Sequence, residues 1–557
     1  MLMTVAEAII KYMQEEEGIE VIFGYPGGAV IGFYDALHNS TLKHVLVRHE
    51  QGAAHAADGY ARSTGKVGVC IATSGPGATN LTTGIATAYM DSIPIVAITG
   101  QVKTSAIGKD SFQEVDTRGI TMPITKHNYL ITNPHEALRI IKEAFYIAKT
   151  GRKGPVLVDI PSDVFLSKIE YSVPSKVDLL GYKPNYDPHP LQIKRAAQLI
   201  KEAERPIILA GGGVIASEAS QELIKFAEKI NAPVVTSLMG KGSIPETHEL
   251  SCGFIGMHGA AYASYAINDS DLIIAIGVRF SDRSTGKVET FAPNAKIIHI
   301  DIDPAEIGKN VNPYVPIVAD AKRALERLVE VVEPKINAMW WEKIKEWKTK
   351  YPLRYRMSND IIKPQYVIER IYELTKGEAI VVTEVGQNQM WAAQYYKVKR
   401  PRQFITSGGL GTMGFGFPAA IGAQIGNRDK IVIDIAGDGS IQMNIQELAT
   451  AASERLPVKI FILNNSCLGM VRQWQELFYE KRYSCTLLDV APNFEKLAEA
   501  YGAYGRRVEK IEELDEAIEW ALNINDSPVI VDIQVNREEN VFPMIPAGGS
   551  IDKMLID

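Results

Sequence analysis

The chain has 557 residues, 46% of them hydrophobic and 45 of them glycine, which is enough for roughly three or four globular domains with sizeable cores. Its 59 basic and 66 acidic side chains leave a net charge of −7 without a basic run, which argues against nucleic acid as a partner. No apolar segment approaches the roughly 18 residues that span a bilayer, and the four cysteines show no metal-type spacing. We therefore expect a cytoplasmic protein with reduced thiols that contacts no membrane.

The chain opens with an amphipathic helix rather than a signal peptide, since Thr4 and Glu7 form a capping box ahead of an apolar stripe. Up to about Leu166, short apolar runs alternate with helical stretches, and this rhythm predicts a parallel sheet flanked by helices. The apolar runs are EVIFG, HVLVRH, VGVCIAT, IPIVAITG and GPVLVDIP.

Two further regions repeat this alternation. A polar, proline-bearing stretch at 171–190 predicts a linker, and a tryptophan-rich helix, MWWEKIKEWKTKY, joins the second region to the third. The expected strands are PIILAGGG, APVVTS, DLIIAIG and KIIHIDID in the second region, and AIVVTEVG, KIVIDIA, VKIFILN and PVIVDIQV in the third. We expect an α/β fold of three doubly wound parallel-sheet domains, the first and third sharing one architecture, at 1–166, 191–332 and 364–545.

The run KIVIDIA and the stretch from Gly437 to Asn465 that follows it predict a strand, a helix and a second strand. A Gly-Asp-Gly-Ser turn follows the first strand, and a helix should bury one face. That face holds Met443, Ile445, Leu448, Ala449 and Ala452. Because the two strands run parallel, their carboxyl ends share one sheet edge, where Asp438 and Asn465 can meet.

A magnesium diphosphate fits such an edge. Mg²⁺ prefers oxygen ligands together with phosphate oxygens, while the turn amides and the helix start favour an anion. A lone Gly-Asp-Gly-Ser is also a common surface turn. The asparagine pair after the second strand, Asn464 and Asn465, favours the functional interpretation.

The first region also places three strand-end elements at one sheet edge, the usual ligand site of an open α/β sheet. These are the turn GYPGGAV, the helix start TSGPGATN, and Glu50, which begins the helix EQGAAHAADGYARSTG. Glu50 alone could serve only to start that helix through the helix dipole. The small residues around it, however, predict close packing, in which a carboxylate needs a specific partner.

Together and in order, these motifs resemble the catalytic subunits of the acetohydroxyacid synthase (acetolactate synthase) family across nearly the whole chain. Further matching stretches are SFQE, GRKGPVLVDIP, GVRFSDR, GQNQMWAAQ, GGLGTMGFGFPAA, NNSCLGMVRQWQ and VFPMIPAGG. The resemblance implies a pyrimidine-binding first domain, a central FAD-binding domain, a diphosphate-binding third domain of thiamine diphosphate (ThDP) enzymes, and a tail at 546–557 near the active site.

The resemblance also implies the reaction and its cofactors. Two 2-oxoacids are joined with loss of CO₂ in branched-chain amino-acid biosynthesis. Pyruvate with pyruvate gives 2-acetolactate, and pyruvate with 2-oxobutyrate gives 2-aceto-2-hydroxybutyrate. The implied cofactors are ThDP, Mg²⁺ and FAD, with FAD structural because the net reaction transfers no electrons.

By the same resemblance, Glu50 would hydrogen-bond the pyrimidine N1′ of ThDP, and Gln113 and Gly28 would lie near the reacting carbon. Asp438, Asn465 and the backbone oxygen of Cys467 would hold Mg²⁺. The implied ThDP contacts are Glu50, Val385, Gly386, Gln387, Met413, Gly439, Ser440, Met443 and Met470. The implied walls of the substrate pocket are Phe112, Met470, Val471 and Trp474, although Trp474 without the family would be taken as a core aromatic residue.

The middle region carries the implied flavin site. Arg279 and Arg283 in GVRFSDR match family arginines that can bind a diphosphate. The glycines of LAGGGV alone do not have the spacing of the dinucleotide-binding motif. The implied FAD contacts are Arg152, Gly211, Gly212, Met257, His258, Gly277, Arg279, Arg283, Asp301, Ile302, Asp320 and Ala321. Three positions depart from the family's usual residues, namely Asn388 for His, Ser162 for Lys and Ser281 for Asp, which leaves cofactor and substrate affinities open.

The family pattern implies a homodimer or tetramer with active sites shared between chains, and a small regulatory subunit. A ThDP pyruvate oxidase that uses its flavin for redox chemistry is an alternative, which RFSDR and MVRQWQ disfavour. A catalytically silent regulatory homologue is another, and the presence of Glu50, Asp438 and Asn465 together speaks against it.

Overall fold

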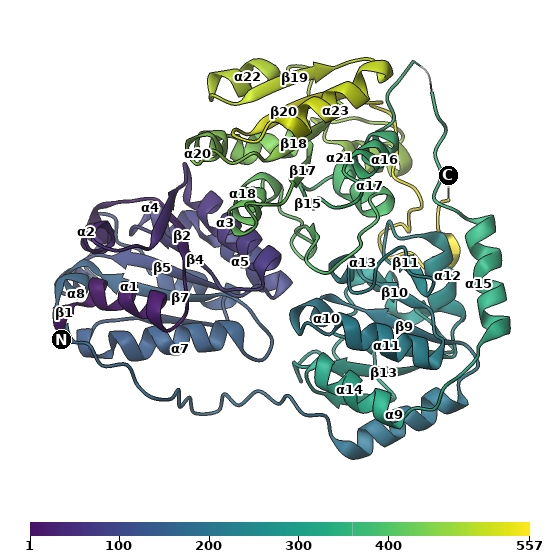
Figure 1. Cartoon of the computed structure of the whole chain (residues 1–557), viewed down its shortest axis with the longest axis horizontal. Coiled ribbons are helices and arrows are strands. Elements are labelled where there is room, and N and C mark those ends of the chain that lie inside the picture. The colour runs from purple at the N-terminus through teal and green to yellow at the C-terminus, as the bar shows by residue number, and fades with distance from the viewer. Residues whose placement is uncertain (359, 557) are drawn as a thin grey trace.

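The computed structural model describes residues 1–358 and 360–556, which form three α/β domains (Figure 1). Each domain is built on a six-stranded parallel sheet flanked by helices. This confirms the predicted α/β class with three parallel-sheet domains. None of the helices in the described ranges combines the length and the apolar character needed to cross a bilayer.

In the first domain the strands lie in the order β3-β2-β4-β5-β7-β6. A short antiparallel pair, β1 (Leu2–Thr4) with β8 (Lys168–Glu170), joins the start of the chain to the end of this domain. The sheet strands are β2 (Val21–Gly24), β3 (Lys43–Leu46), β4 (Gly68–Ala72), β5 (Ile95–Gln101), β6 (His127–Leu130) and β7 (Val156–Pro161). The α-helices are α1 (Val5–Glu15), α2 (Ile31–His38), α3 (Glu50–Thr64), α4 (Pro76–Asn80), α5 (Thr82–Asp91), α6 (Thr117–Thr121), α7 (Ala137–Lys149) and α8 (Ser162–Leu166).

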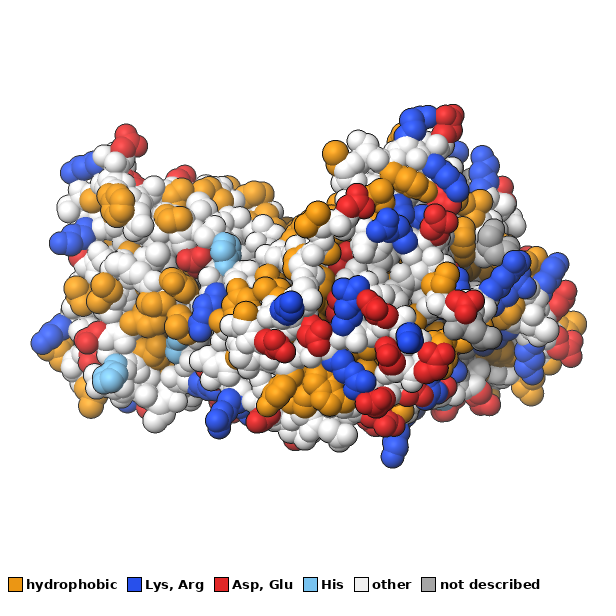
Figure 2. Space-filling view, turned by 90° about the horizontal axis from the view of Figure 1, so that it is seen from above, with side chains coloured by type: hydrophobic (Ala, Val, Ile, Leu, Met, Phe, Trp, Pro, Cys, Tyr) orange, Lys and Arg blue, Asp and Glu red, His pale blue; other side chains and the backbone are white. Residues whose placement is uncertain are grey.

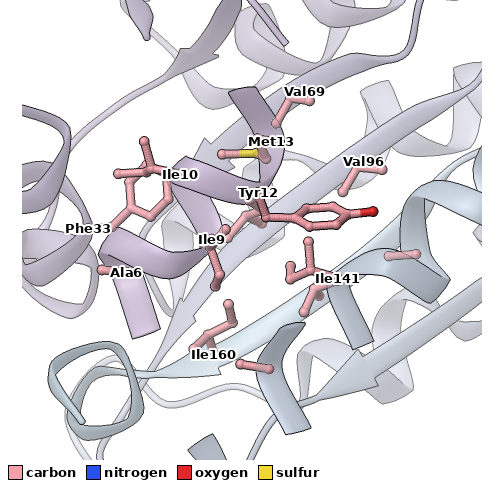
Figure 3. Packing of buried hydrophobic residues seen from close by; sticks show 14 of the residues in the cluster. Ala6, Ile9, Ile10, Tyr12, Met13, Phe33, Val69, Val96, Ile141 and Ile160 are labelled. Carbon is pink, nitrogen blue, oxygen red and sulfur yellow. The ribbon is translucent and has the colours of Figure 1, made fainter. Parts of the chain in front are cut away.

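Helix α1 follows from its sequence signals. The Glu7 N–H donates to Thr4 Oγ1 at 3.2 Å and the Thr4 N–H donates to the Glu7 carboxylate at 2.7 Å, so the predicted capping box is present. Figure 3 shows Ile9 and Tyr12 of the apolar face among core residues such as Ile141. Burying this face fixes the helix against the sheet.

In the middle domain the strands lie in the order β11-β10-β9-β12-β13-β14. They are β9 (Pro206–Ala210), β10 (Val234–Thr236), β11 (Ser251–Phe254), β12 (Leu272–Ile276), β13 (Lys296–Asp301) and β14 (Val315–Val318). The helices are α9 (Pro190–Glu202), α10 (Gly212–Ala216), α11 (Ser220–Ile230), α12 (Ala261–Asp269), α13 (Asp282–Thr285), α14 (Ala321–Val331) and α15 (Ala338–Lys350).

In the third domain the order is β16-β15-β17-β18-β20-β19. The strands are β15 (Ile380–Thr383), β16 (Phe404–Ile405), β17 (Val432–Gly437), β18 (Lys459–Asn464), β19 (Tyr504–Val508) and β20 (Val529–Gln534). The helices are α16 (Pro364–Leu374), α17 (Gln387–Tyr395), α18 (Gly416–Gly426), α19 (Asp438–Ile441), α20 (Leu448–Ser453), α21 (Gly469–Phe478), α22 (Phe494–Ala500) and α23 (Leu514–Asn523).

The strand orders relate the domains to one another. Counted along each domain, the first and third sheets share the order 2-1-3-4-6-5, as expected, while the middle sheet has the order 3-2-1-4-5-6. The last order is that of dinucleotide-binding α/β domains, whose ligand lies where the strand sequence reverses, between the first and fourth strands. In this chain those strands are β9 and β12.

The first and third domains touch along α3 and α18, which lie side by side in Figure 1. A Cβ on Gly59 would overlap the carbonyl oxygen of Ala419, and a Cβ on Gly422 would overlap that of Ala56. The two helices therefore pack backbone against backbone, which only glycine at these two crossing points permits.

The segment after the Gly-Asp-Gly-Ser turn departs from the single helix that was predicted. It forms α19, the 3₁₀ turn η7 (Gln442–Glu447) and α20, with a non-helical backbone at Asn444 (φ −135°, ψ 28°). The side chain of Asn444 donates to the carbonyl oxygen of Gly414 at 2.7 Å, which holds the break. As a result Met443, predicted on the buried face, is 54% exposed, while Leu448 is buried.

The linker packs against the first domain before it crosses to the middle domain, and the tail packs on the middle domain. Residues 171–189 form no helix or strand and cross from the first domain to α9 (Figure 1). Near the C-terminus, the Ile545 N–H donates to the Met257 carbonyl at 2.8 Å and the Lys287 N–H to the Gly549 carbonyl at 3.0 Å. Residue 557 lies outside the described residues, and the predicted tail therefore begins beside Met257 and contacts the middle domain through Gly549.

Candidate active site

Asp438 and Asn465 lie close together at the carboxyl edge of the third sheet. Asp438 follows β17, Asn465 follows β18, and these strands are parallel neighbours. Burial raises the pKa of Asp438 to about 7, against backbone hydrogen bonds that include one from Asn465. In the described part of the chain, the buried oxygen Oδ2 of Asp438 has no hydrogen-bond partner. A buried carboxylate oxygen left open in this way is suited to a cation.

Gln387 and Cys467 meet Asn465 at the same edge. The Asn465 side chain donates to Gln387 Oε1 at 3.1 Å, and the Cys467 N–H approaches Asn465 Oδ1 at 3.3 Å. Gln387 in turn donates to Gln473 Oε1 at 2.9 Å. The predicted magnesium ligands and one predicted ThDP contact therefore form one connected group, with Asp438 as its only carboxylate.

Ser440 rests on a buried glutamate. The Ser440 hydroxyl donates to Glu384, whose two carboxylate oxygens also accept the N–H groups of Gly414 at 2.8 Å and Phe417 at 3.0 Å. Beside it lies Asp434, fully buried, and neither of its carboxylate oxygens has a hydrogen-bond partner among the described residues. Burial and the neighbouring Glu384 raise the pKa of Asp434 well above its usual value.

The loop between β15 and α17 explains one of the predicted glycines. Asn388 donates from Nδ2 to the Ile435 carbonyl at 2.8 Å, and its Oδ1 lies 2.7 Å from the place of a Cβ on Gly386. With a φ of 153°, Gly386 also has a backbone conformation that favours glycine. Asn388, the departure from the family's His, thus has one of its two N–H bonds engaged by the protein itself.

The three catalytic candidates of the first domain follow β2, β3 and β5. Glu50 is half-buried at the start of α3, and the Asn80 side chain donates to its Oε2 at 3.0 Å. Gln113 (φ 60°) presents its carbonyl oxygen 2.8 Å from the place of a Cβ on Gly75. A Cβ on Gly28 would have no protein atom within 4 Å in the described chain. This edge is therefore open.

In the described residues, one chain does not bring the predicted site residues of the two edges into contact. Phe112 is 88% exposed, and Val471 and Met443 are 50% and 54% exposed. No hydrogen bond or ring contact within residues 1–358 and 360–556 joins Glu50 or Phe112 to Asp438, Val471 or Met443. Figure 2 shows hydrophobic side chains, in orange, exposed on the part of the molecule that holds the first domain.

Trp474 lies on α21 with its indole nitrogen buried. It is half-buried, and its ring meets Phe478 edge-on at 6.5 Å. It belongs to none of the buried hydrophobic clusters in the described residues, whereas Met470 on the same helix packs against the core of the third domain. The position of Trp474 beside the exposed Val471 suits a pocket wall better than a core residue.

A cavity of about 470 Å³ lies where the three domains meet. Eleven of the twelve residues assigned to FAD line it, namely Arg152, Gly212, Met257, His258, Gly277, Arg279, Arg283, Asp301, Ile302, Asp320 and Ala321. Gly211 is the exception and does not line the cavity. A Cβ at this position would overlap the carbonyl oxygen of Gly277, so the glycine allows close packing of the backbone. Val385 at one end of the cavity also donates its N–H to Ser440 Oγ at 3.3 Å.

The cavity carries charge of both signs. Arg152 pairs with Glu306 at 2.6 Å, and burial raises the pKa of Asp301 to about 6. Burial lowers the pKa of His258 to about 4, so this ring is neutral near pH 7, and its Nε2 has no partner in the described residues. Arg279 donates to the Met90 carbonyl of the first domain.

Three sequence families match the chain, and all describe thiamine pyrophosphate enzymes. They are the N-terminal TPP binding domain at residues 3–120, the central domain at 193–328 and the C-terminal TPP binding domain at 384–533. The acetolactate synthase large subunit of Corynebacterium glutamicum is 53% identical over 98% of this chain and 89% of its own length. That of Haemophilus influenzae is 48% identical over 99% and 98%, and the acetolactate synthase of Mycobacterium bovis 51% identical over 99% and 91%.

The chain belongs to the acetolactate synthase large-subunit family of thiamine pyrophosphate enzymes. The structure adds to the motifs of this family several groups that the sequence did not single out. Arg62 is buried between Asp58 and Asp91, and Asp91 accepts the N–H groups of Gly408 and Gly409. Asp58 and Arg62 are four residues apart on one helix, but Asp91 and Glu384 accept hydrogen bonds from residues far away in the sequence, so no local pattern marks them.

We expect Asp434→Asn to stabilise the cofactor-free protein more at pH 8 than at pH 5, relative to the wild type. A carboxyl group whose pKa is raised by folding contributes stability that is complete only below its ordinary pKa of 3.8 and is lost progressively as the pH rises toward its folded pKa. The amide removes this loss. Thermal unfolding temperatures at the two pH values measure it, with the exposed Asp429→Asn as control. An equal shift at both pH values would contradict the expectation.

Proposed function

We propose that the chain acts as an acetolactate synthase, joining pyruvate to pyruvate or to 2-oxobutyrate with loss of CO₂ in branched-chain amino-acid biosynthesis. Relatives named acetolactate synthase align with nearly the whole chain. The observation that carries the proposal is the group at the edge of the third sheet. There, the unpartnered Asp438 oxygen adjoins Asn465 and the Gln387 amide.

The third domain fits a magnesium diphosphate. Asp438, Asn465 and the Cys467 carbonyl offer the oxygen ligands that Mg²⁺ prefers. The proposed ThDP contacts around them, Val385, Gly386, Gln387, Met413, Gly439, Ser440, Met443 and Met470, come from this same edge. When bound, ThDP supplies the electron sink for decarboxylation, while the protein supplies placement.

The first domain supplies the proton chemistry in this proposal. Glu50, oriented by Asn80, would hydrogen-bond the pyrimidine N1′ and hold the proton at that atom. The open space at Gly28 and the exposed loop at Gln113 leave room for the oxoacid beside the reacting carbon. Phe112, Val471 and Trp474 would form the apolar walls that receive the acceptor.

FAD fits the cavity between the domains. Gly212 follows β9 and Gly277 follows β12, the two strands at which a 3-2-1-4-5-6 sheet reverses its order and binds dinucleotides. Arg152, Arg279 and Arg283 offer positive charge for a diphosphate, and Asp301 and Asp320 offer acceptors for ribose hydroxyls. We propose a structural flavin, since the reaction transfers no electrons.

We propose that the active site is completed by a second copy of the chain. Among the described residues of one chain, no hydrogen bond joins Glu50 to Asp438, and the hydrophobic side chains of Phe112, Met443 and Val471 are exposed. The relatives from Corynebacterium glutamicum and Haemophilus influenzae are named large subunits, so we also propose a smaller regulatory subunit as a partner.

The activity itself is tested with a colorimetric acetolactate assay on pyruvate, omitting ThDP, Mg²⁺ and FAD in turn. We expect product only when all three are present, because each has a fitting site in the chain. Oxygen consumption is followed in parallel. Oxygen uptake that matches pyruvate loss would identify an oxidase instead, and absence of any product with all cofactors bound would indicate a silent homologue.

A mixture of Glu50→Ala and Asp438→Ala proteins should recover part of the activity that each has lost. In a mixed dimer, one of the two sites receives Glu50 from one chain and Asp438 from the other, so it is intact. Acetolactate formation is measured after subunit exchange has been verified by mass spectrometry. Failure to recover activity in confirmed mixed dimers would show that each chain builds its own site.

We expect Trp474→Leu to reduce the preference for 2-oxobutyrate over pyruvate while acetolactate is still formed. If the indole packs on the additional methyl group, its loss removes roughly 1–3 kcal/mol, or about 10–200-fold in selectivity. Both products are measured in one reaction with the two acceptors in competition. The exposed Tyr479→Leu, directly after the same helix, is the control, and an unchanged product ratio in flavin-loaded Trp474→Leu would exclude this role.

A further inference from the structure

A glutamate of the third domain holds the backbone directly in front of Glu50. Glu447, the last residue of η7, is 1% exposed. Its Oε1 accepts the N–H groups of Arg48 and His49, each at 3.0 Å, although these residues belong to the first domain. Its Oε2 accepts the Thr450 hydroxyl at 2.7 Å.

These bonds supply acceptors to the N–H groups of Arg48 and His49. Backbone N–H groups near the start of a helix have no partner within the helix and need one from elsewhere. His49 caps α3 with its own side chain, which accepts the Gln51 N–H at 3.1 Å. Glu447 accepts the N–H groups of Arg48 and His49, so a residue of the third domain holds the backbone at the start of α3.

The contact is closely fitted. Gly52, in the first turn of α3, faces the carboxylate, and a Cβ there would lie 2.6 Å from Glu447 Oε1. That distance is below any ordinary contact, so even a methyl group would push the carboxylate away. Thr450, on the helix α20 that follows Glu447, also reaches the first domain, since its hydroxyl lies 3.1 Å from the Leu46 carbonyl at the end of β3.

We propose that Glu447 is a positioning residue for Glu50, an inference that rests on the proposed function. Glu50 comes immediately after the two residues that Glu447 holds, and a displacement of about 1 Å at a reacting group can cost on the order of 100-fold in rate. Glu447 also ends the segment that begins with Asp438 and includes Ser440 and Met443. The hydrogen bonds of Glu447 to Arg48 and His49 therefore connect the segment that carries Asp438 with the residues in front of Glu50 in the same chain.

The test compares four variants, measuring the rate at which bound ThDP exchanges its C2 proton for deuterium. Glu447→Ala removes the acceptor, and Gly52→Ala displaces it without removing it. Glu447→Gln keeps an oxygen for the Arg48 and His49 N–H groups, while its NH₂ can donate to Thr450. Glu454→Ala is the matched control, because it breaks the Lys43–Glu454 ion pair (2.6 Å) between the same two domains.

We expect C2 exchange to fall about 10- to 100-fold in Glu447→Ala and Gly52→Ala, and to stay within about threefold of wild type in Glu447→Gln and Glu454→Ala. In the cofactor-free proteins, amide hydrogen exchange of a peptide covering residues 46–56 should rise in the first two variants only. This second measurement does not depend on bound cofactor. If Glu447→Ala does not fold, Gly52→Ala and Glu447→Gln still provide the comparison.

Two outcomes would overturn the proposal. One is wild-type C2 exchange in folded Glu447→Ala or Gly52→Ala protein, and the other is an equal loss in Glu447→Gln and Glu454→Ala, which would indicate a general effect of domain contact. Failure of the proposed function is distinct, because the wild-type protein with all cofactors would then show neither C2 exchange nor acetolactate.

Discussion

The backbone contact between α3 and α18 is the constraint on which the rest of the molecule depends. With Gly59 and Gly422 at the crossing, no side chain can adjust the separation of the first and third domains. Helix α3 then carries Glu50 at one end and Arg62 at the other, about 18 Å apart along the axis. The first end reaches Glu447, and the second reaches Asp91 and the loop that lines the central cavity. One rigid helix thus sets both proposed cofactor regions.

The sequence predicted the centre of each six-stranded sheet but only one of the six edge strands, β3. Every strand expected from an apolar run is present, while the five missed strands of these sheets, β6, β11, β14, β16 and β19, all lie at sheet edges, and the short pair β1 and β8 was missed as well. An edge strand has one neighbour and is less buried, so it needs neither length nor an apolar run. β19 reads Tyr-Gly-Arg-Arg-Val, and β16 has only two residues. These edge strands therefore form because of the neighbouring strand, which the local sequence does not reveal, and not because of their own β-propensity.

The same limit separates the site residues that could be predicted from those that could not. Asp438 and Asn465 follow parallel strands, so topology alone brings them together. Asp91 and Glu447 follow no such rule, because their partners lie in another domain. The break at Asn444 is of this kind, since its cause is the carbonyl oxygen of Gly414, about one strand and helix earlier in the chain.

The internal likeness of the first and third domains explains why one chain leaves its sites open. Both sheets have the order 2-1-3-4-6-5, and α3 and α18 each join the second strand of their domain to the third. Equivalent helices of two like domains therefore pack on each other, as in a two-fold interface. That pairing fixes the two domains but leaves Phe112 of the first domain and Met443 and Val471 of the third exposed. In the proposed two-chain site, a second copy with the same pair of domains would cover these residues.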